Sequence, residues 1–72
     1  MTVQFGLLGA GRIGKVHARA IRGDADATLV AVADAVPAAA EAIARDYGCA
    51  IRSIDEIARS PDIDAVVICT PT

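Results

Sequence analysis

The sequence predicts an α/β fold in which four short strands alternate with three helices, in the order β-α-β-α-β-α-β. Three observations favour this class. Apolar runs of four to six residues recur along the chain, segments with helical patterns separate them, and glycine or proline bounds most of the runs. Strands and helices that alternate in this way form a parallel sheet with right-handed crossovers.

The composition limits the chain to one small globular domain and excludes several functions. Of its 72 residues, 54% are hydrophobic and 22% are charged, which is typical of a folded domain with a thin stability margin. A net charge of −2 and only 3% aromatic residues argue against a nucleic-acid partner. Cys49 and Cys69 are too few for a disulfide framework or a zinc site. Reduced thiols, no basic leader and no long apolar run predict a cytoplasmic protein without membrane contact.

The first strand and the first helix flank a glycine-rich turn. Residues 3–8 form an apolar run that ends in glycine, which is typical of a strand buried on both faces. Residues 12–22 have a helical pattern. One face of this helix, expected to be its apolar side, carries Ile13, Val16, His17 and Ala20.

A second strand and helix follow in the same order. Residues 28–33 are apolar and end at Asp34. Pro37 suits the first position of a helix, because an N–H there would be unpaired in any case. The alanine-rich segment 37–47 therefore predicts the second helix, which Gly48 ends.

The last part of the chain predicts two strands and a short helix. Residues 49–52 indicate a weak third strand. Ser53 and Glu56 have the spacing of a capping box, in which each side chain accepts a hydrogen bond from the other residue's backbone N–H. A helix over 54–59 should follow, and the apolar run of residues 65–70 predicts the fourth strand.

The turn after the first strand is a G-x-G-x-x-G motif over residues 9–14. Gly9 permits a tight turn, Gly11 lets a pyrophosphate approach the backbone, and Gly14 allows the helix to pack closely on the first strand. Free N–H groups at the start of the helix would face the pyrophosphate. The motif is informative because it follows a predicted strand and opens a predicted helix.

Asp34 supplies the acid that completes this pattern. It lies 20 residues beyond Gly14, at the end of the second strand, where such an acid accepts hydrogen bonds from the adenosine ribose. Its charge would repel a 2′-phosphate, and the following Ala35 and Val36 offer no arginine to bind one. The sequence therefore predicts a Rossmann-type dinucleotide site that takes NAD in preference to NADP.

Other nucleotide sites remain as alternatives. A P-loop needs Ser or Thr after its Gly-Lys pair, whereas Val16 follows Lys15 here. A methyltransferase also combines a glycine loop with an acid after the second strand and binds a methyl-donor nucleoside. FAD enzymes share the glycine motif but usually carry Glu at the acid position, and Asp34 could also be a simple turn residue. The complete motif favours a pyrophosphate-containing ligand.

Residues 9–17, 30–34 and 64–72 together resemble the N-terminal region of the Gfo/Idh/MocA oxidoreductases, and within that family most closely the inositol 2-dehydrogenases. The resemblance covers the whole chain. It implies oxidation of a hydroxyl of inositol or a related sugar, with hydride passing to NAD. It also implies a cofactor site in which the glycine loop lines the pyrophosphate, the acid holds the adenosine ribose, and the loop after the fourth strand lies near the ribose groups. The residues concerned are Gly9, Gly11, Arg12, Ile13, Gly14, Asp34, Thr70, Pro71 and Thr72.

No catalytic residue is expected within residues 1–72. The family's catalytic Lys, in a Glu-Lys-Pro motif, and its Asp and His acid–base pair have no counterpart here. His17 matches a family histidine but is expected on the helix face, bonded to nearby backbone. The resemblance thus implies the N-terminal half of a Rossmann domain, with strand order 3-2-1-4, no substrate domain and no activity of its own. The alternatives are an excised or engineered Rossmann fragment used to study folding and self-assembly, and a regulatory NAD-sensing module.

Such a sheet would be incompletely covered. Two helices should cover one face, whereas the short third helix only begins to cover the other. The fourth strand would form an exposed apolar edge, and the bare face is expected around Leu8 and Val67. The sequence therefore predicts self-association as a two-fold homodimer.

Overall fold

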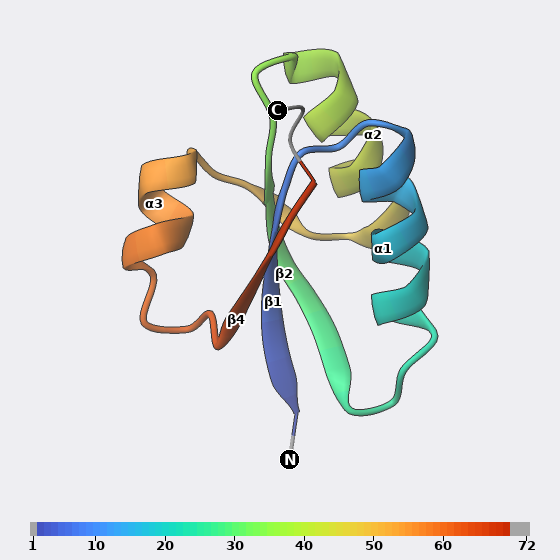
Figure 1. Cartoon of the computed structure of the whole chain (residues 1–72), viewed down its shortest axis with the longest axis vertical. Helices are drawn as coiled ribbons and strands as arrows, with labels where there is room; N and C mark the ends of the chain where they lie inside the picture. The colour runs from blue at the N-terminus through green and yellow to red at the C-terminus, as the bar shows by residue number, and fades with distance from the viewer. Residues whose placement is uncertain (1, 70–72) are drawn as a thin grey trace.

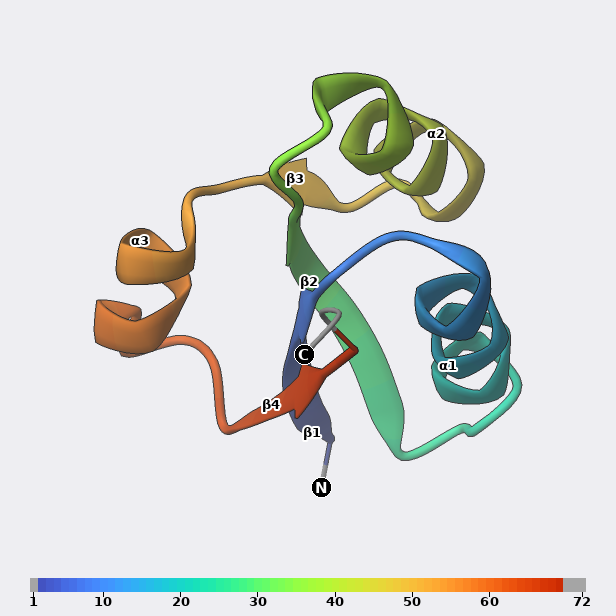
Figure 2. The ribbon, with the colours of Figure 1, turned by 45° about the horizontal axis from the view of Figure 1, so that its top comes forward.

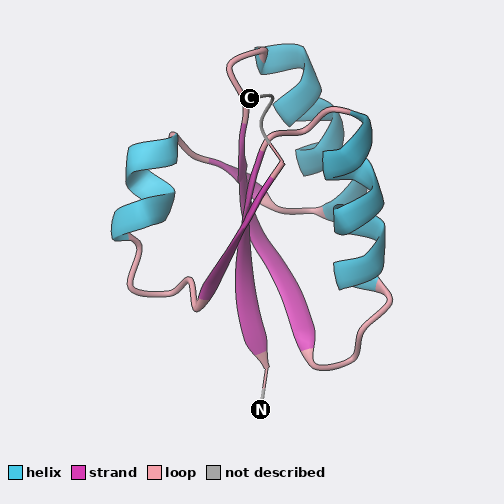
Figure 3. Cartoon of the chain, viewed as in Figure 1, coloured by secondary structure: helices cyan, strands magenta, loops and turns pink. Residues whose placement is uncertain are grey.

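The computed structural model describes residues 2–69 and confirms the alternating α/β order. Its four strands form one parallel sheet of order β3-β2-β1-β4, as predicted. The strands run side by side through the middle of the molecule, with helices on both sides (Figures 1 and 3). The elements are β1 (Val3–Leu8), α1 (Arg12–Arg22), β2 (Ala27–Ala33), α2 (Pro37–Tyr47), β3 (Ala50–Ile51), α3 (Ile54–Arg59) and β4 (Ala65–Ile68).

The two outer strands are shorter than the sequence predicts. β3 has two residues instead of four, and it lies at the edge of the sheet, where it pairs only with β2. β4 ends at Ile68 instead of at residue 70, which lies outside the described residues. The Cys69 N–H still donates to the Leu8 carbonyl oxygen over 2.7 Å, which extends the contact with β1 by one residue.

The helices divide unequally between the two faces of the sheet. α1 and α2 lie side by side against one face, and α3 lies alone against the other (Figure 2). The larger core cluster fills the α1/α2 side, and a smaller one of Ala31, Ala33 and Ile57 lies under α3. The larger cluster contains Leu7, Ala10, Ala18, Ile21, Leu29, Val32, Ala40 and Ile43.

The buried face of α1 differs from the prediction. The residues that face the sheet are Gly14, Ala18 and Ile21, whereas Ile13 and Val16 are 56% and 58% exposed. His17 and Ala20 are exposed as well. The helix approaches the sheet closely at its start, so small residues line the contact there and Ile13 and Val16 lie on the outer surface, whereas Ile21 enters the core at the other end of the helix.

The bare part of the sheet lies on the α3 side, as predicted, and half-buried Leu8 lies on this side, but Val67 does not. Leu7 pairs with Val67 and Leu8 pairs with Ile68, so Leu8 and Val67 point to opposite faces. Val67 packs against the α1/α2 core. The uncovered side chains are Val66 and Ile68 on the α3 side, 40% and 71% exposed. We call these two residues the β4 patch.

Candidate functional site

The predicted site residues gather at the carboxyl ends of β1 and β2. The loop of residues 9–11 leaves β1 there and enters α1, at the upper end of the sheet in Figure 1. Asp34 follows β2 at the same edge. The Ala10 N–H donates to Asp34 Oδ2 over 2.6 Å, although the two residues are 24 positions apart. Ligands of parallel α/β sheets bind outside this edge.

Two glycines of the G-x-G-x-x-G motif are required by the protein's own structure. Gly9 has φ 102°, a left-handed conformation that disfavours other residues, and its N–H donates to the Ala33 carbonyl oxygen over 2.8 Å. A Cβ at Gly14 would lie 2.9 Å from the Gly9 carbonyl carbon and would collide with the carbonyl oxygen. These two residues therefore set the turn and the close approach of α1 to β1.

Gly11 is different, because nothing in the described chain requires a glycine there. Its backbone is extended, with φ −76°, and a Cβ built on it would meet no atom within 4 Å. The side chain that this position lacks would project into open space at the start of α1. That space is where a bound pyrophosphate would approach the backbone.

The start of α1 has no side-chain cap and no acidic residue in its first turn. Gly11 is the N-cap residue and provides no side-chain hydrogen bond. The first helical bond runs from the Lys15 N–H to the Gly11 carbonyl oxygen over 2.9 Å. The N–H groups of Arg12, Ile13 and Gly14 come before it, at the positive end of the helix dipole. Such a terminus favours an anion.

The start of α3 shows the opposite arrangement. The Glu56 N–H donates to Ser53 Oγ over 3.1 Å, and the Ser53 N–H donates to Glu56 Oε1 over 2.8 Å. This is the predicted capping box. Asp55 and Glu56 also place two carboxylates in the first turn. α3 therefore satisfies its own terminus, whereas α1 leaves its terminus available for a ligand.

The Asp34 carboxylate is held by two backbone N–H groups. Oδ2 accepts from Ala10, and Oδ1 accepts from Val36 over 2.7 Å. These hydrogen bonds, first that of Ala10 and then that of Val36, lower the pKa of Asp34 below its ordinary value of 3.8. The group is therefore ionised at neutral pH. Each carboxylate oxygen keeps a further lone-pair site, so it can still accept hydrogen bonds from ribose hydroxyls.

A hollow beside Asp34 lies between α2, β3 and the start of α3. Its polar lining includes the carboxylates of Glu41 and Glu56 and one cation, Arg52. Arg52 is already engaged, because its Nη1 donates to Ser60 Oγ over 2.6 Å and lies 3.3 Å from Asp62 Oδ1. Within the hollow no other cation is present to bind a phosphate. These charges suit an uncharged ribose hydroxyl beside Asp34 better than a 2′-phosphate.

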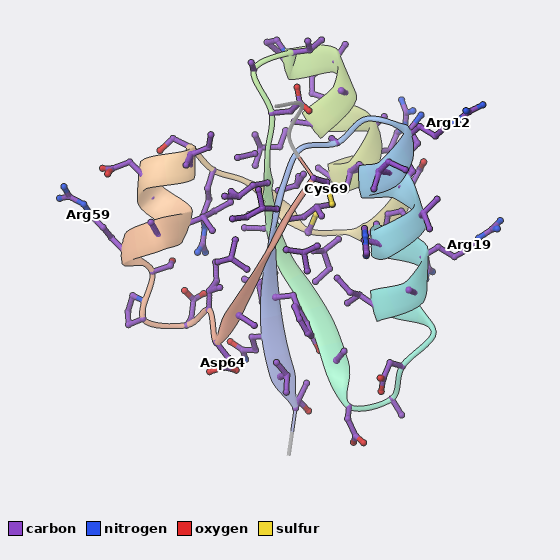
Figure 4. The ribbon with its side chains drawn as sticks, in the orientation of Figure 1. Arg12, Arg19, Arg59, Asp64 and Cys69 are labelled. Atoms are coloured by element: carbon purple, nitrogen blue, oxygen red, sulfur yellow. The ribbon has the colours of Figure 1, made fainter. Side chains whose placement is uncertain are left out.

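The remaining predicted residues are less closely gathered. The side chain of Arg12 extends from α1 away from the sheet (Figure 4), so its backbone N–H is the group nearest the loop. Ile13 is mostly exposed. Thr70, Pro71 and Thr72 lie outside the described residues. Within residues 2–69, no three His, Cys, Asp or Glu side chains are grouped to hold a metal ion, and no helix is long and apolar enough to cross a membrane.

Two members of the site were missed from the sequence, namely Ala10 and Val36. Both contribute a backbone N–H to Asp34, and every residue except proline has one. Val36 lies two residues after Asp34, so its bond is the local turn that aspartate commonly forms, and the sequence could have indicated it. Ala10 is 24 positions from Asp34, and only the folded positions of the two loops bring its N–H to the carboxylate.

Comparison with known proteins identifies the family. The sequence model of the GFO/IDH/MocA oxidoreductase family, with NAD-binding Rossmann fold, matches residues 3–72. The inositol 2-dehydrogenase of Rhizobium meliloti (strain 1021) is 76% identical over 72 residues, which is 100% of this chain and 22% of that protein.

Solved structures agree with this assignment. The myo-inositol dehydrogenase of Corynebacterium glutamicum ATCC 13032 has a TM-score of 0.90 at 39% identity, over 99% of this chain and 22% of that one. The scyllo-inositol dehydrogenase of Lactobacillus casei, solved with NAD(H) and scyllo-inositol, has a TM-score of 0.86 at 34% identity with the same coverage. The chain thus spans about a fifth of the length of these relatives. It belongs to the GFO/IDH/MocA oxidoreductase family, whose fold is an NAD-binding Rossmann fold.

Proposed function

We propose that this chain binds NAD across the carboxyl edge of β1 and β2, through nine residues. The pyrophosphate lies on the loop and the first turn of α1, and Asp34 accepts hydrogen bonds from the adenosine ribose. The observation that carries the proposal is the open space at Gly11, before an uncapped helix terminus, in a fold that does not itself need glycine there. The binding residues are Gly9, Gly11, Arg12, Ile13, Gly14, Asp34 and, in the loop after β4, Thr70, Pro71 and Thr72.

The preference for NAD over NADP follows from charge. Asp34 is ionised, and Glu41 and Glu56 share the hollow beside it. A 2′-phosphate at this ribose would meet these carboxylates, whereas Arg52 is held by Ser60 and Asp62. NADP should therefore bind more weakly than NAD.

The parent reaction that we propose is oxidation of a hydroxyl of inositol or a related sugar, as the names of the relatives suggest. When bound, the nicotinamide supplies the hydride acceptor. A general base must also take the hydroxyl proton. His17 is exposed on α1, and the carboxylate beside the loop, Asp34, is a weak base because its pKa is lowered by the Ala10 and Val36 N–H groups. We therefore propose that residues 1–72 are a half-domain that binds NAD but turns over no substrate alone.

Isothermal calorimetry can test the binding. NAD should bind more tightly than NADP, and a methyl-donor nucleoside or FAD should bind more weakly than either. Asp34→Ala should weaken NAD binding and reduce the preference over NADP. Equal NAD affinity for the two proteins would remove the role of Asp34, and a tighter complex with NADP would overturn the cofactor preference. NAD reduction by the purified chain in the presence of inositol would contradict the proposed inactivity.

A second candidate function is that of a folding and self-assembly unit without activity, as an excised or engineered fragment would be. The observation that favours it is the β4 patch, an apolar surface on an edge strand. Pairing of two copies at this strand would give a two-fold dimer. Cys49 and Cys69 are free thiols, which suits the reducing cytoplasm that we propose as its location.

A further inference from the structure

We propose that Asp34 is also a positioning residue for the glycine loop, so that its carboxylate couples the pyrophosphate and ribose parts of the cofactor site. This inference rests on the NAD site proposed above and adds a role that does not involve the ribose. The role belongs to the protein without ligand, because both carboxylate oxygens are already bonded to backbone N–H groups.

The geometry of the loop supports this role. Two hydrogen bonds tie it to the end of β2, one from the Gly9 N–H to the Ala33 carbonyl oxygen (2.8 Å) and one from the Ala10 N–H to Asp34 Oδ2 (2.6 Å). The second is the only one of the pair that depends on a side chain. It acts on the residue immediately before Gly11, where the pyrophosphate would approach.

Asp34 also fixes the next turn of the chain. Its Oδ1 accepts the Val36 N–H over 2.7 Å, just before α2 begins at Pro37. One carboxylate therefore holds the β1–α1 loop and the β2–α2 loop together. Charge-assisted hydrogen bonds of this kind are about twice as strong as neutral ones. A loop held in advance loses less entropy when its ligand binds.

The inference can be tested with a cofactor that has no hydroxyls on its adenosine ribose. We would measure binding of NAD and of its 2′,3′-dideoxyadenosine analogue to the wild-type chain and to Asp34→Ala. Alanine removes both acceptors, whereas asparagine could keep its one carbonyl oxygen on the Ala10 N–H. If Asp34 positions the loop, Asp34→Ala should weaken binding of the dideoxy analogue by at least about fivefold.

A role limited to the ribose predicts the opposite outcome. Without hydroxyls to bind, the substitution would leave the affinity for the analogue unchanged, or raise it because a negative charge near the pyrophosphate is removed. Either result would overturn the positioning role. Failure of the wild-type chain to bind NAD at all would refute the proposed function instead, and the next measurement would then decide the inference.

Amide hydrogen exchange measures the Ala10–Asp34 hydrogen bond without any ligand. Asp64 is a matched control, because its Oδ2 accepts the Gln4 N–H over 2.8 Å, at the opposite end of the sheet where β4 begins (Figure 4). Asp34→Ala should speed exchange of the Ala10 amide at least about tenfold and spare Gln4, and Asp64→Ala should do the reverse. Unchanged Ala10 exchange in a folded Asp34→Ala protein would refute the positioning role of the Asp34 carboxylate.

Discussion

Glycines in one short motif can be required for different reasons. At Gly14 the reason is internal, because a Cβ would collide with the Gly9 carbonyl group. At Gly11 neither the backbone conformation nor a neighbouring atom calls for glycine. The two positions therefore separate the requirement of the fold from the requirement of a ligand.

A matched pair of substitutions tests this distinction. Gly14→Ala should lower the free energy of unfolding by about 1–3 kcal/mol, because the added methyl group overpacks the contact between α1 and β1. Gly11→Ser should leave stability within about 0.5 kcal/mol or raise it, since serine is a good N-cap residue. It should nevertheless weaken NAD binding at least about tenfold by filling the space before the helix terminus. Urea unfolding and calorimetry provide the two measurements.

The opposite pattern would contradict the assignment. If Gly11→Ser unfolded the protein while retaining NAD affinity, Gly11 would be a structural residue and the pyrophosphate would bind elsewhere. If Gly14→Ala had no effect on stability, α1 would not approach β1 closely enough to require glycine at this position.

The ionisation of Asp34 should contribute to stability at low pH. Backbone hydrogen bonds lower its pKa in the folded chain below 3.8, so the unfolded chain takes up the proton first as the pH falls. The stabilisation is fully present above about pH 5 and is lost as the pH falls through the lowered folded pKa. Urea midpoints between about pH 6 and pH 3 should fall less steeply for Asp34→Asn than for the wild type. If the urea midpoints of the two proteins fell equally steeply with pH, this contribution would be contradicted.

At the scale of elements, the two helix starts show which features can be predicted locally. The capping box of Ser53 and Glu56 depends on residues three positions apart, and the structure confirms it. The sheet-facing side of α1 depends instead on how near the helix approaches β1. The apolar pattern of Ile13 and Val16 therefore indicated the wrong side, whereas the contact is made by Gly14 and Ala18.

The cap of α3 gives a prediction at this scale. Ser53→Ala removes the side chain that accepts the Glu56 N–H, and it should lower the free energy of unfolding by about 1 kcal/mol. Glu56→Gln is the control, because glutamine preserves a capping box and should stay within about 0.5 kcal/mol of the wild type. Denaturant unfolding followed by circular dichroism measures both. Equal stability of Ser53→Ala and the wild type would show that the box contributes nothing.

At the scale of the whole molecule, most of the topology could be predicted from the order of the elements, but the side-chain faces could not. The strand order and the division of helices between two faces follow from the alternating pattern and the glycine motif. The face on which Val67 lies depends on its register with Leu7. A shift of one residue reverses every side chain of a strand, and an apolar run such as residues 65–68 has no alternation that fixes the register.

The exposed apolar side chains on β4 lead to a prediction for self-association. The β4 patch consists of Val66 and Ile68 on an edge strand, and burial of an isoleucine side chain contributes about 1.5–3 kcal/mol. We expect the chain to sediment as a dimer at micromolar concentration. Ile68→Lys should raise the dissociation constant at least about tenfold, because lysine on an edge strand opposes pairing. Ile51→Lys is the control, since Ile51 is also half-exposed but lies on β3 at the opposite edge. A monomeric wild-type chain at this concentration would refute the homodimer, and dissociation by Ile51→Lys but not Ile68→Lys would place the interface at β3.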